Sequence, residues 1–183
     1  MGRKRNTTNS IAGTYEISTG ELVVEPDPFR DGAFILNING VPSSHLIPDE
    51  PRTLEFEYMR WIAAAVENLS PGKRLLHLGG GGCSLPRYFA DLWPDSHNTV
   101  VELDAKLAEL IRELADIPSS PRVKIRAGEA RAVTEGFPPN RFDVIIRDVF
   151  AGAVTPEPLT TVEFFQHAHA TLSPGGLYVA NCG

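Results

Sequence analysis

The stretch that decides the fold is Leu75-Leu76-His77-Leu78-Gly79-Gly80-Gly81-Gly82-Cys83-Ser84, which is followed by a helical pattern from Leu85 to Leu92. Glycines let a chain turn sharply and let its amides approach a ligand at the positive end of the next helix. This order of strand, glycine loop and helix predicts a nucleotide-binding turn. Ser84 stands where the dinucleotide fingerprint has its third glycine, so the glycine pattern alone is an imperfect match.

From this stretch to the end of the chain, short apolar runs alternate with helical patterns. Strands are expected at Arg74 to Leu78, Thr99 to Leu103, Val123 to Arg126, Phe142 to Arg147 and Leu177 to Ala180, and helices at Leu85 to Leu92, Ala105 to Leu114 and Thr160 to Leu172. Alternation of this kind is typical of parallel strands joined by crossover helices. We therefore predict an α/β fold with a doubly wound, Rossmann-like parallel sheet.

The N-terminal part of the chain has a different pattern. Between residues 13 and 47, short runs of β-forming residues are broken by turn pairs such as Asp31-Gly32 and Asn39-Gly40. Turn pairs between β-forming runs are typical of hairpins. The sequence therefore predicts a small β-hairpin domain ahead of the parallel sheet.

A helix is expected between these two parts. Apolar residues recur every three or four positions from Thr53 to Leu69, and Pro71-Gly72 is expected to end the helix. The resulting division is a disordered tail over residues 1–12, a β-domain over 13–52 and a nucleoside-binding domain over 53–183.

The composition excludes several classes of protein. Of the 183 residues, 42% are hydrophobic and 22% are charged, which is typical of one folded, soluble domain with a small appendage. A net charge of -6 disfavours nucleic acid as a partner. Apolar runs such as Trp61 to Val66 are far shorter than the ~20 residues of a membrane span. With only two cysteines, the chain is expected in the cytoplasm, with no membrane partner.

Three acidic residues follow the ends of expected strands. Glu102 lies 23 residues after Gly79, where a carboxylate can accept both hydroxyls of a ribose, and Glu129 and Asp148 end later strands. The carboxyl ends of parallel strands line the ligand crevice of such folds. We therefore expect the three carboxylates to converge on one pocket.

Each of these acids also has a plainer interpretation. Glu102 can be a solvated residue at a strand end. Asp148 continues the buried row of its strand, where a carboxylate is costly unless it is functional or paired, so an ion pair with Arg147 or Arg141 is an alternative.

The other reactive side chains favour structural roles. His77 lies within an apolar strand and the pair Phe164-Phe165 within a helix, so both are expected in the core. Cys83 lies near a helix start, but no base stands beside it in the sequence, and a packing role is expected. His167 and His169 point to different helix faces, so we predict no metal.

Taken together, these residues resemble the spermidine synthase family over nearly the whole chain. The likeness is carried by Leu78 to Gly82, Val101 to Asp104, Ala127 to Ala130 and Phe142 to Asp148, and upstream by Phe34 to Val41 and Leu54 to Tyr58. The resemblance implies a class I methyltransferase-like sheet. It also implies transfer of an aminopropyl group from decarboxylated S-adenosylmethionine to an amine.

The resemblance implies specific residue roles. Glu102 would bind the ribose, Glu129 the adenine amino group, Asp148 would accept the proton of the attacking amine, and Tyr58 would line the acceptor channel. The implied donor-binding set is Gly79, Gly80, Gly81, Glu102, Glu129 and Ala130. A small-molecule amine substrate and a homo-oligomeric assembly are expected with it.

Two positions depart from the family pattern. The family usually has Asp where this chain has Gly82 and Ala151. An alkylammonium has a pKa of ~10, so the attacking amine needs a base and its cationic ends need carboxylates. An absent carboxylate at residue 82 also favours ordinary S-adenosylmethionine as donor. A methyltransferase and a non-catalytic nucleoside-binding or assembly module therefore stay open beside the aminopropyltransferase.

The last expected strand, Leu177 to Ala180, would lie at a sheet edge. Exposed edges are normally protected by charge, proline or a covering element, and residues 177–182 contain neither charge nor proline. We therefore expect that the chain is a fragment of a longer protein or that another chain covers this edge.

Overall fold

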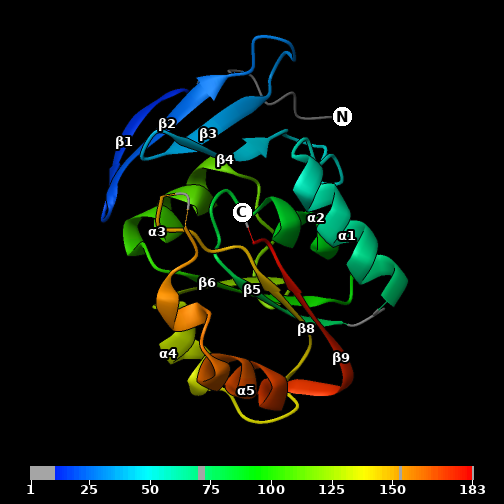
Figure 1. The fold of residues 1–183 in the computed structure, drawn as a ribbon. Helices are drawn as coiled ribbons and strands as arrows, with labels where there is room; N and C mark the ends of the chain where they lie inside the picture. The colour runs from blue at the N-terminus through cyan, green and yellow to red at the C-terminus, as the bar shows by residue number, and fades with distance from the viewer. Residues whose placement is uncertain (1–10, 70–72, 153, 183) are drawn as a thin grey trace.

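The computed structural model describes residues 11–69, 73–152 and 154–182 and contains two sheets (Figure 1). The antiparallel sheet has the order β1 (Gly13–Ile17), β2 (Gly20–Pro26), β3 (Phe34–Ile38) and β4 (Val41–Leu46). The parallel sheet has the order β7 (Val123–Ala127), β6 (His97–Glu102), β5 (Arg74–Leu78), β8 (Phe142–Arg147) and β9 (Leu172–Ala180). The predicted fold class is confirmed.

Helices cover both faces of the parallel sheet. They are α1 (Glu57–Leu69), α2 (Ser84–Leu92), α3 (Ala105–Leu114), α4 (Ala130–Glu135) and α5 (Val162–Thr171), with a 3-10 turn at Glu157–Leu159. In Figure 1, α1 and α2 lie above the sheet and α4 and α5 below it. Leu75, Leu76 and Leu78 of the central strand are fully buried because both faces are covered.

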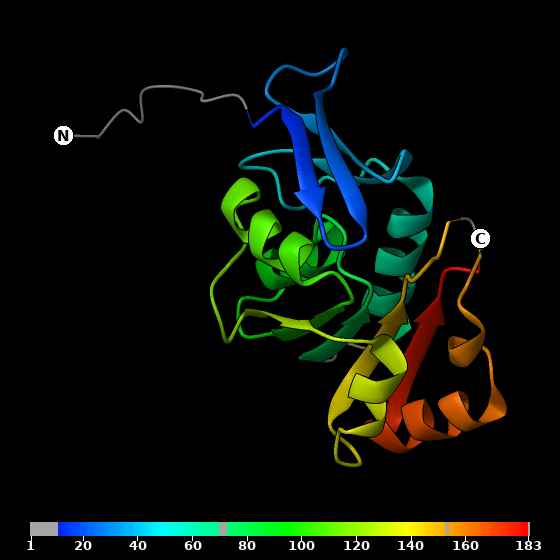
Figure 2. The same cartoon turned by 90° about the vertical axis from the view of Figure 1, so that its left-hand side faces the viewer.

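The small sheet shares a hydrophobic core with the parallel sheet. Leu22 and Leu36 of the small sheet pack in one buried cluster with Val100, Leu107 and Ile111. Figure 2 shows the β1–β2 hairpin beside α3, where the backbone N–H of Thr19 donates to Asp104 Oδ2 at 2.6 Å. Burial of apolar surface and hydrogen bonds therefore join the two sheets.

Most expected ends in the parallel-sheet part lie within two residues of the observed ones, two elements begin further away, and helix α4 was not expected. Helix α1 begins at Glu57 instead of Thr53, because the carbonyls of Leu54 and Glu55 accept hydrogen bonds from the Arg60 side chain. Strand β9 begins at Leu172 instead of Leu177, directly after α5. The predicted helix end at Pro71-Gly72 and the first ten residues of the predicted tail lie outside the described residues.

The expected core residues include one error. Phe164 is fully buried, but Phe165 is 44% exposed, because consecutive helical residues point about 100° apart and here Phe165 points away from the buried cluster that contains Phe164. Burial of His77 is confirmed, and its Nε2 lies 3.0 Å from Asn98 Oδ1. Burial lowers the His77 pKa to about 4, so this imidazole is neutral at pH 7.

Strand β9 lies at the edge of the sheet, as predicted, and within the described ranges it pairs with β8 alone. Its residues Leu177 and Val179 pack against the cluster on the α1 side, and Tyr178 packs on the α5 side. Among the described residues, no helix has the length and apolar character needed to cross a membrane.

A substitution at the glycine loop tests the contact between the two sheets. Gly82 donates its N–H to Ser44 Oγ at 2.8 Å, and a Cβ at residue 82 would lie 2.6 Å from the Ser44 Cβ and 3.1 Å from Leu36 Cδ2. Because close-packed sites tolerate added atoms poorly, Gly82→Ala is expected to lower the free energy of unfolding by about 1–3 kcal/mol. Urea denaturation followed by circular dichroism measures this change.

Two variants serve as controls. Gly136→Ala places its Cβ at ordinary contact, 3.5 Å from the Val133 carbonyl oxygen, and is expected to be neutral. Ser44→Gly removes the crowded Ser44 atoms but also the acceptor of the residue 82 N–H, so the double variant should lose less stability than the sum of the two single variants. Equal stability of Gly82→Ala and the wild type would refute the contact.

Candidate active site

The carboxyl ends of β5 and β8 meet where the strand order reverses. From β5 the chain builds outward to β6 and β7, and then returns to the other side to form β8 and β9. Ligands of open α/β sheets bind at this switch point. Here the backbone N–H of Asp148 donates to the Leu78 carbonyl at 2.8 Å, so Asp148 lies beside the start of the glycine loop.

Gly79 must be glycine at this junction. Its φ is +91°, and an added Cβ would lie 2.0 Å from the Asp148 carbonyl oxygen. A side chain would collide with the backbone just after β8, and a left-handed φ is strained for other residues. The structure therefore places the predicted loop residue Gly79 directly against the predicted base.

Glu102 organises the other side of the loop. Its Oε2 accepts the N–H groups of Gly80 at 2.9 Å and Gly81 at 3.2 Å, and its Oε1 accepts the N–H of Asp104 at 3.0 Å. Each carboxylate oxygen has two lone pairs, so Oε1 retains one for a ligand hydroxyl, whereas Oε2 can accept a second hydroxyl only in place of one of its two N–H bonds. Glu102 is half-buried and is not simply a solvated strand end.

Glu129 lies one strand further out. Ala127 at the end of β7 is in register with Glu102, so the following Glu129 is at the same edge of the sheet. Its two carboxylate oxygens accept the N–H groups of Arg131 at 2.8 Å and Ala132 at 2.7 Å and cap α4. Glu129 is exposed and the adjacent Ala130 is buried.

Asp148 is held by two side chains from distant parts of the chain. Tyr58 of α1 donates its hydroxyl to Asp148 Oδ2 at 3.0 Å, and Asn181 Nδ2 donates to Oδ1 at 3.1 Å. Neither Arg147 nor Arg141 forms an ion pair with Asp148 among the described residues, so the salt-bridge interpretation is wrong.

The environment of Asp148 suits a proton acceptor. Burial raises the pKa of its carboxyl above the usual range, and the hydrogen bonds from Asn181 and Tyr58 and the Arg147 charge only partly oppose this effect. Burial and the Asp148 charge raise the pKa of Tyr58, which therefore stays protonated as the donor. Strongly perturbed titratable groups in a crevice are typical of functional sites.

Sequence reasoning missed Asn181. It follows the end of β9, and its backbone N–H donates to the Arg147 carbonyl at 2.9 Å. The rule that strand ends line the crevice could have identified it, because this is the pattern that identified Asp148 and Glu102.

The two positions that depart from the family pattern have different surroundings. Gly82 is crowded by Ser44, so an aspartate there would require β4 to move. Ala151 is exposed in a turn, with its N–H bonded to the Val154 carbonyl at 2.9 Å. Cys83 is buried, and burial raises its pKa to about 12, so the thiol is protonated and its position supports a packing role.

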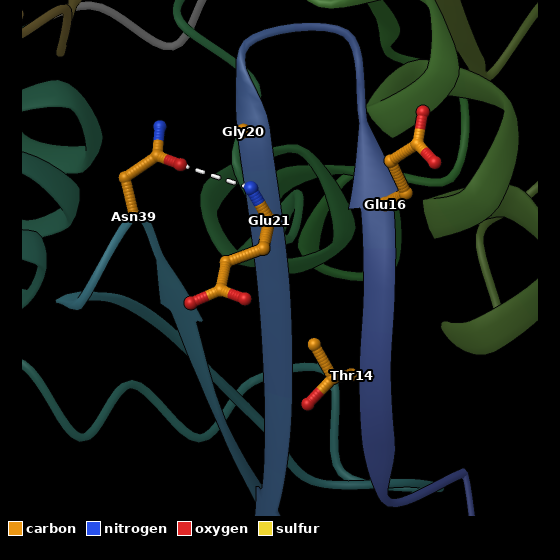
Figure 3. Close-up of a pocket in the computed structure, with 5 residues that line it drawn as sticks. All are labelled: Thr14, Glu16, Gly20, Glu21 and Asn39. Carbon is orange, nitrogen blue, oxygen red and sulfur yellow. Dashed lines mark hydrogen bonds between the residues drawn. The ribbon is translucent and has the colours of Figure 1, made fainter.

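A hollow on the small sheet is separate from this site. It is lined by Thr14, Glu16, Gly20, Glu21 and Asn39, and Figure 3 shows Glu21 donating its N–H to Asn39 Oδ1, a distance of 3.0 Å. Glu16 and Glu21 are directly opposite in the β1–β2 register, and Glu16 pairs with Lys106 at 2.7 Å. No predicted site residue lines this hollow.

Known proteins resemble the chain in both sequence and structure. A family described as spermine/spermidine synthase domain matches residues 55–182. A polyamine aminopropyltransferase of Vibrio vulnificus (strain CMCP6) is 31% identical over 134 residues, covering 72% of this chain and 45% of the relative. The chain spans about half the length of such curated relatives.

Two solved structures extend the likeness. A probable spermidine synthase from Corynebacterium glutamicum ATCC 13032 has a TM-score of 0.89 and 57% identity, covering 94% of this chain and 64% of that one. Human methyltransferase-like protein 13, in complex with SAH, has a TM-score of 0.59 and 25% identity. This match covers 67% of this chain and 63% of that one. Since the matched family covers well over half of the residues, the chain belongs to the spermine/spermidine synthase domain family.

Proposed function

We propose that this chain carries the donor site and the proton acceptor of an aminopropyltransferase that uses decarboxylated S-adenosylmethionine and a small amine. The observation that carries the proposal is the half-buried Asp148 carboxylate at the switch point, bonded to Tyr58 and Asn181 and raised in pKa. Family membership supports aminopropyl transfer as the type of reaction.

The donor nucleoside would bind over the glycine loop. Glu102 would accept the ribose hydroxyls, while Glu129 would accept the adenine amino group with Ala130 beside it. The contact between Glu102 and the amides of Gly80 and Gly81 supports this arrangement, because it holds the carboxylate above the loop before any ligand arrives. A pre-oriented acceptor binds hydroxyls with less loss of entropy.

The chemical step needs a base. The amine nitrogen attacks the methylene carbon bonded to the sulfonium, so a C–N bond forms and the C–S bond breaks. The electron pair of the C–S bond stays on sulfur and leaves methylthioadenosine, and the proton from nitrogen goes to Asp148. An amine has a pKa of ~10, so raising the Asp148 pKa reduces the mismatch between base and amine.

A methyltransferase is the second candidate. The glycine at residue 82 favours it, because no carboxylate there would repel the carboxylate of ordinary S-adenosylmethionine. Calorimetric titration with S-adenosylmethionine, its decarboxylated form and methylthioadenosine separates the candidates. Preference for the decarboxylated donor supports the proposal, preference for the carboxylated donor supports a methyltransferase, and no binding of any of them indicates a non-catalytic module.

The role of Glu102 can be tested by Glu102→Ala. Nucleoside affinity is expected to fall by roughly 1.5 to 3 kcal/mol, the scale of charge-assisted hydrogen bonds. The free protein should also lose about 1–3 kcal/mol of stability, because backbone N–H groups of the loop lose their acceptor. Glu102→Gln keeps one acceptor oxygen, so its nucleoside affinity and its stability should lie between those of the wild type and Glu102→Ala. An unchanged affinity for methylthioadenosine in Glu102→Ala would place the ribose elsewhere.

Asp148→Asn tests the base. Turnover is expected to be lost while nucleoside affinity stays within a few-fold, because the base acts on the acceptor and not on the ribose. Assays of transfer and calorimetry of methylthioadenosine binding measure the two effects. Full activity of this variant would remove Asp148 from the mechanism.

The difference in stability between Asp148→Asn and the wild type should depend on pH. Because the folded-state pKa of Asp148 is raised, ionising this carboxyl destabilises the folded protein as pH rises through that pKa. Asp148→Asn should therefore be at least as stable as the wild type at neutral pH, and the difference should shrink as the pH falls. Thermal unfolding over a range of pH measures this difference. If Asp148→Asn were less stable than the wild type at neutral pH and became more stable relative to it at lower pH, the raised pKa of Asp148 would be contradicted.

A further inference from the structure

Arg147 is a buried cation next to the proposed base. It ends β8, immediately before Asp148, and is only 4% exposed. Successive residues of a strand point to opposite faces, so Arg147 lies on the α5 side of the sheet while Asp148 lies on the α1 side with Tyr58.

The Arg147 guanidinium contacts two side chains that carry no carboxylate. Its Nη1 donates to Thr155 Oγ1 at 2.8 Å and its Nη2 contacts Cys182 Sγ at 3.8 Å. Its Nε is buried without a hydrogen-bond acceptor, and within the described part of the chain no carboxylate pairs with it. The Asp148 carboxylate acts on Arg147 through its charge alone, without an ion pair. A buried charge with no directly paired carboxylate is costly, so this position favours the arrival of an anion.

A second buried polar group lies beside it. The Tyr178 hydroxyl also has no hydrogen-bond partner among the described residues. Arg147 is close enough that its charge opposes the rise in the Tyr178 pKa caused by burial, although the geometry leaves both the hydroxyl and Nε unbonded. One carboxylate oxygen can accept from a guanidinium and a phenol together.

The guanidinium lies at the same edge of the sheet as the proposed reaction. Thr155 and Cys182 follow the carboxyl ends of β8 and β9, so the group that they contact lies beyond those strand ends. Asn181 bonds to Asp148 and the next residue, Cys182, contacts Arg147. These two neighbours link the proposed base to the cation.

We propose that Arg147 binds a carboxylate of the acceptor, so that the acceptor is an amine carrying an acidic group and not a plain diamine. This inference rests on the proposed function for the identity of the reacting amine. A diamine would bring a second ammonium toward Arg147, whereas an amino acid would bring the missing counter-ion. Ala151, at the start of the exposed turn after β8, supplies no carboxylate to hold a second ammonium.

The position of Arg147 favours the acceptor over the donor as the source of the carboxylate. Arg147 lies on the β9 side of the switch point, whereas the glycine loop and Glu102 lie on the β5 and β6 side. A donor bound over the loop therefore approaches Asp148 from the opposite side.

The test compares two probes that each have four methylenes between their end groups, putrescine and δ-aminovalerate. Each is titrated by calorimetry into the full chain saturated with methylthioadenosine. The wild type should bind δ-aminovalerate at least about tenfold more tightly, the scale of one charge-assisted contact. Arg147→Met should lose that preference and Arg147→Lys should retain part of it, because lysine keeps the charge without the planar fork.

Matched controls separate a local effect from net charge and from folding. Arg141→Met removes the same charge at the opposite end of β8, where Arg141 is exposed over the Phe142 ring, and should keep the preference. Because no carboxylate of the described residues forms an ion pair with Arg147, Arg147→Met should fold, and its thermal unfolding is measured alongside. If it does not fold, the wild-type comparison of the two probes decides by itself.

Each remaining outcome overturns one specific claim. Tighter binding of putrescine by the wild type, no binding of either probe, or an unchanged preference in Arg147→Met overturns the acceptor inference. A loss of S-adenosylmethionine affinity in Arg147→Met, with binding of δ-aminovalerate unchanged, would assign the residue to the donor carboxylate and also overturn it. Failure of methylthioadenosine to bind contradicts the proposed function instead, and the probes are then titrated into the free protein.

Discussion

The contact between the backbone of Gly79 and the backbone of Asp148 is the constraint on which the site depends. Only a residue without a Cβ can turn away from β5 at this point, because the Asp148 carbonyl occupies the space. The turn sends the loop over the sheet edge, where Glu102 receives the amides of Gly80 and Gly81. One close approach thus sets the proposed donor-binding groups on one side of the loop and the proposed base on the other.

The buried charges near this contact explain the chemistry that the site can support. Asp148 keeps its carboxylate in a half-buried position with only two neutral donors, a state that favours taking up a proton. Arg147, its neighbour in sequence, is buried on the other face, and no carboxylate of the described residues forms an ion pair with it. Arg147 at the end of β8 and Asp148 just after it are therefore the proposed anion-binding group and the proposed proton acceptor at one edge of the sheet.

Much of the fold could be predicted from the sequence because its signals are local. The alternation of apolar runs with helical patterns indicated the parallel sheet, and the glycine run between a strand and a helix indicated the loop. The acids at residues 102, 129 and 148 were found because strand ends share one edge. Helix limits were less accurate: the apolar spacing near Thr53 does not indicate that the Leu54 and Glu55 carbonyls accept from the Arg60 side chain just before α1.

The missed features depend on contacts between distant residues. Nothing near Gly82 in the sequence shows that Ser44 fills the space beside it, and nothing near Arg147 shows that its Nε has no acceptor. Tyr58 was named only through the family resemblance, and its bond to Asp148 spans 90 positions. Such contacts are set by how α1 and the small sheet pack on the parallel sheet.

A crystal structure of the protein with methylthioadenosine tests the central claim most directly. The account predicts that both ribose hydroxyls lie within hydrogen-bond distance of Glu102 and that the thioether sulfur faces the crevice beside Asp148. A nucleoside bound away from the glycine loop, or with its sulfur turned away from Asp148, would contradict the account.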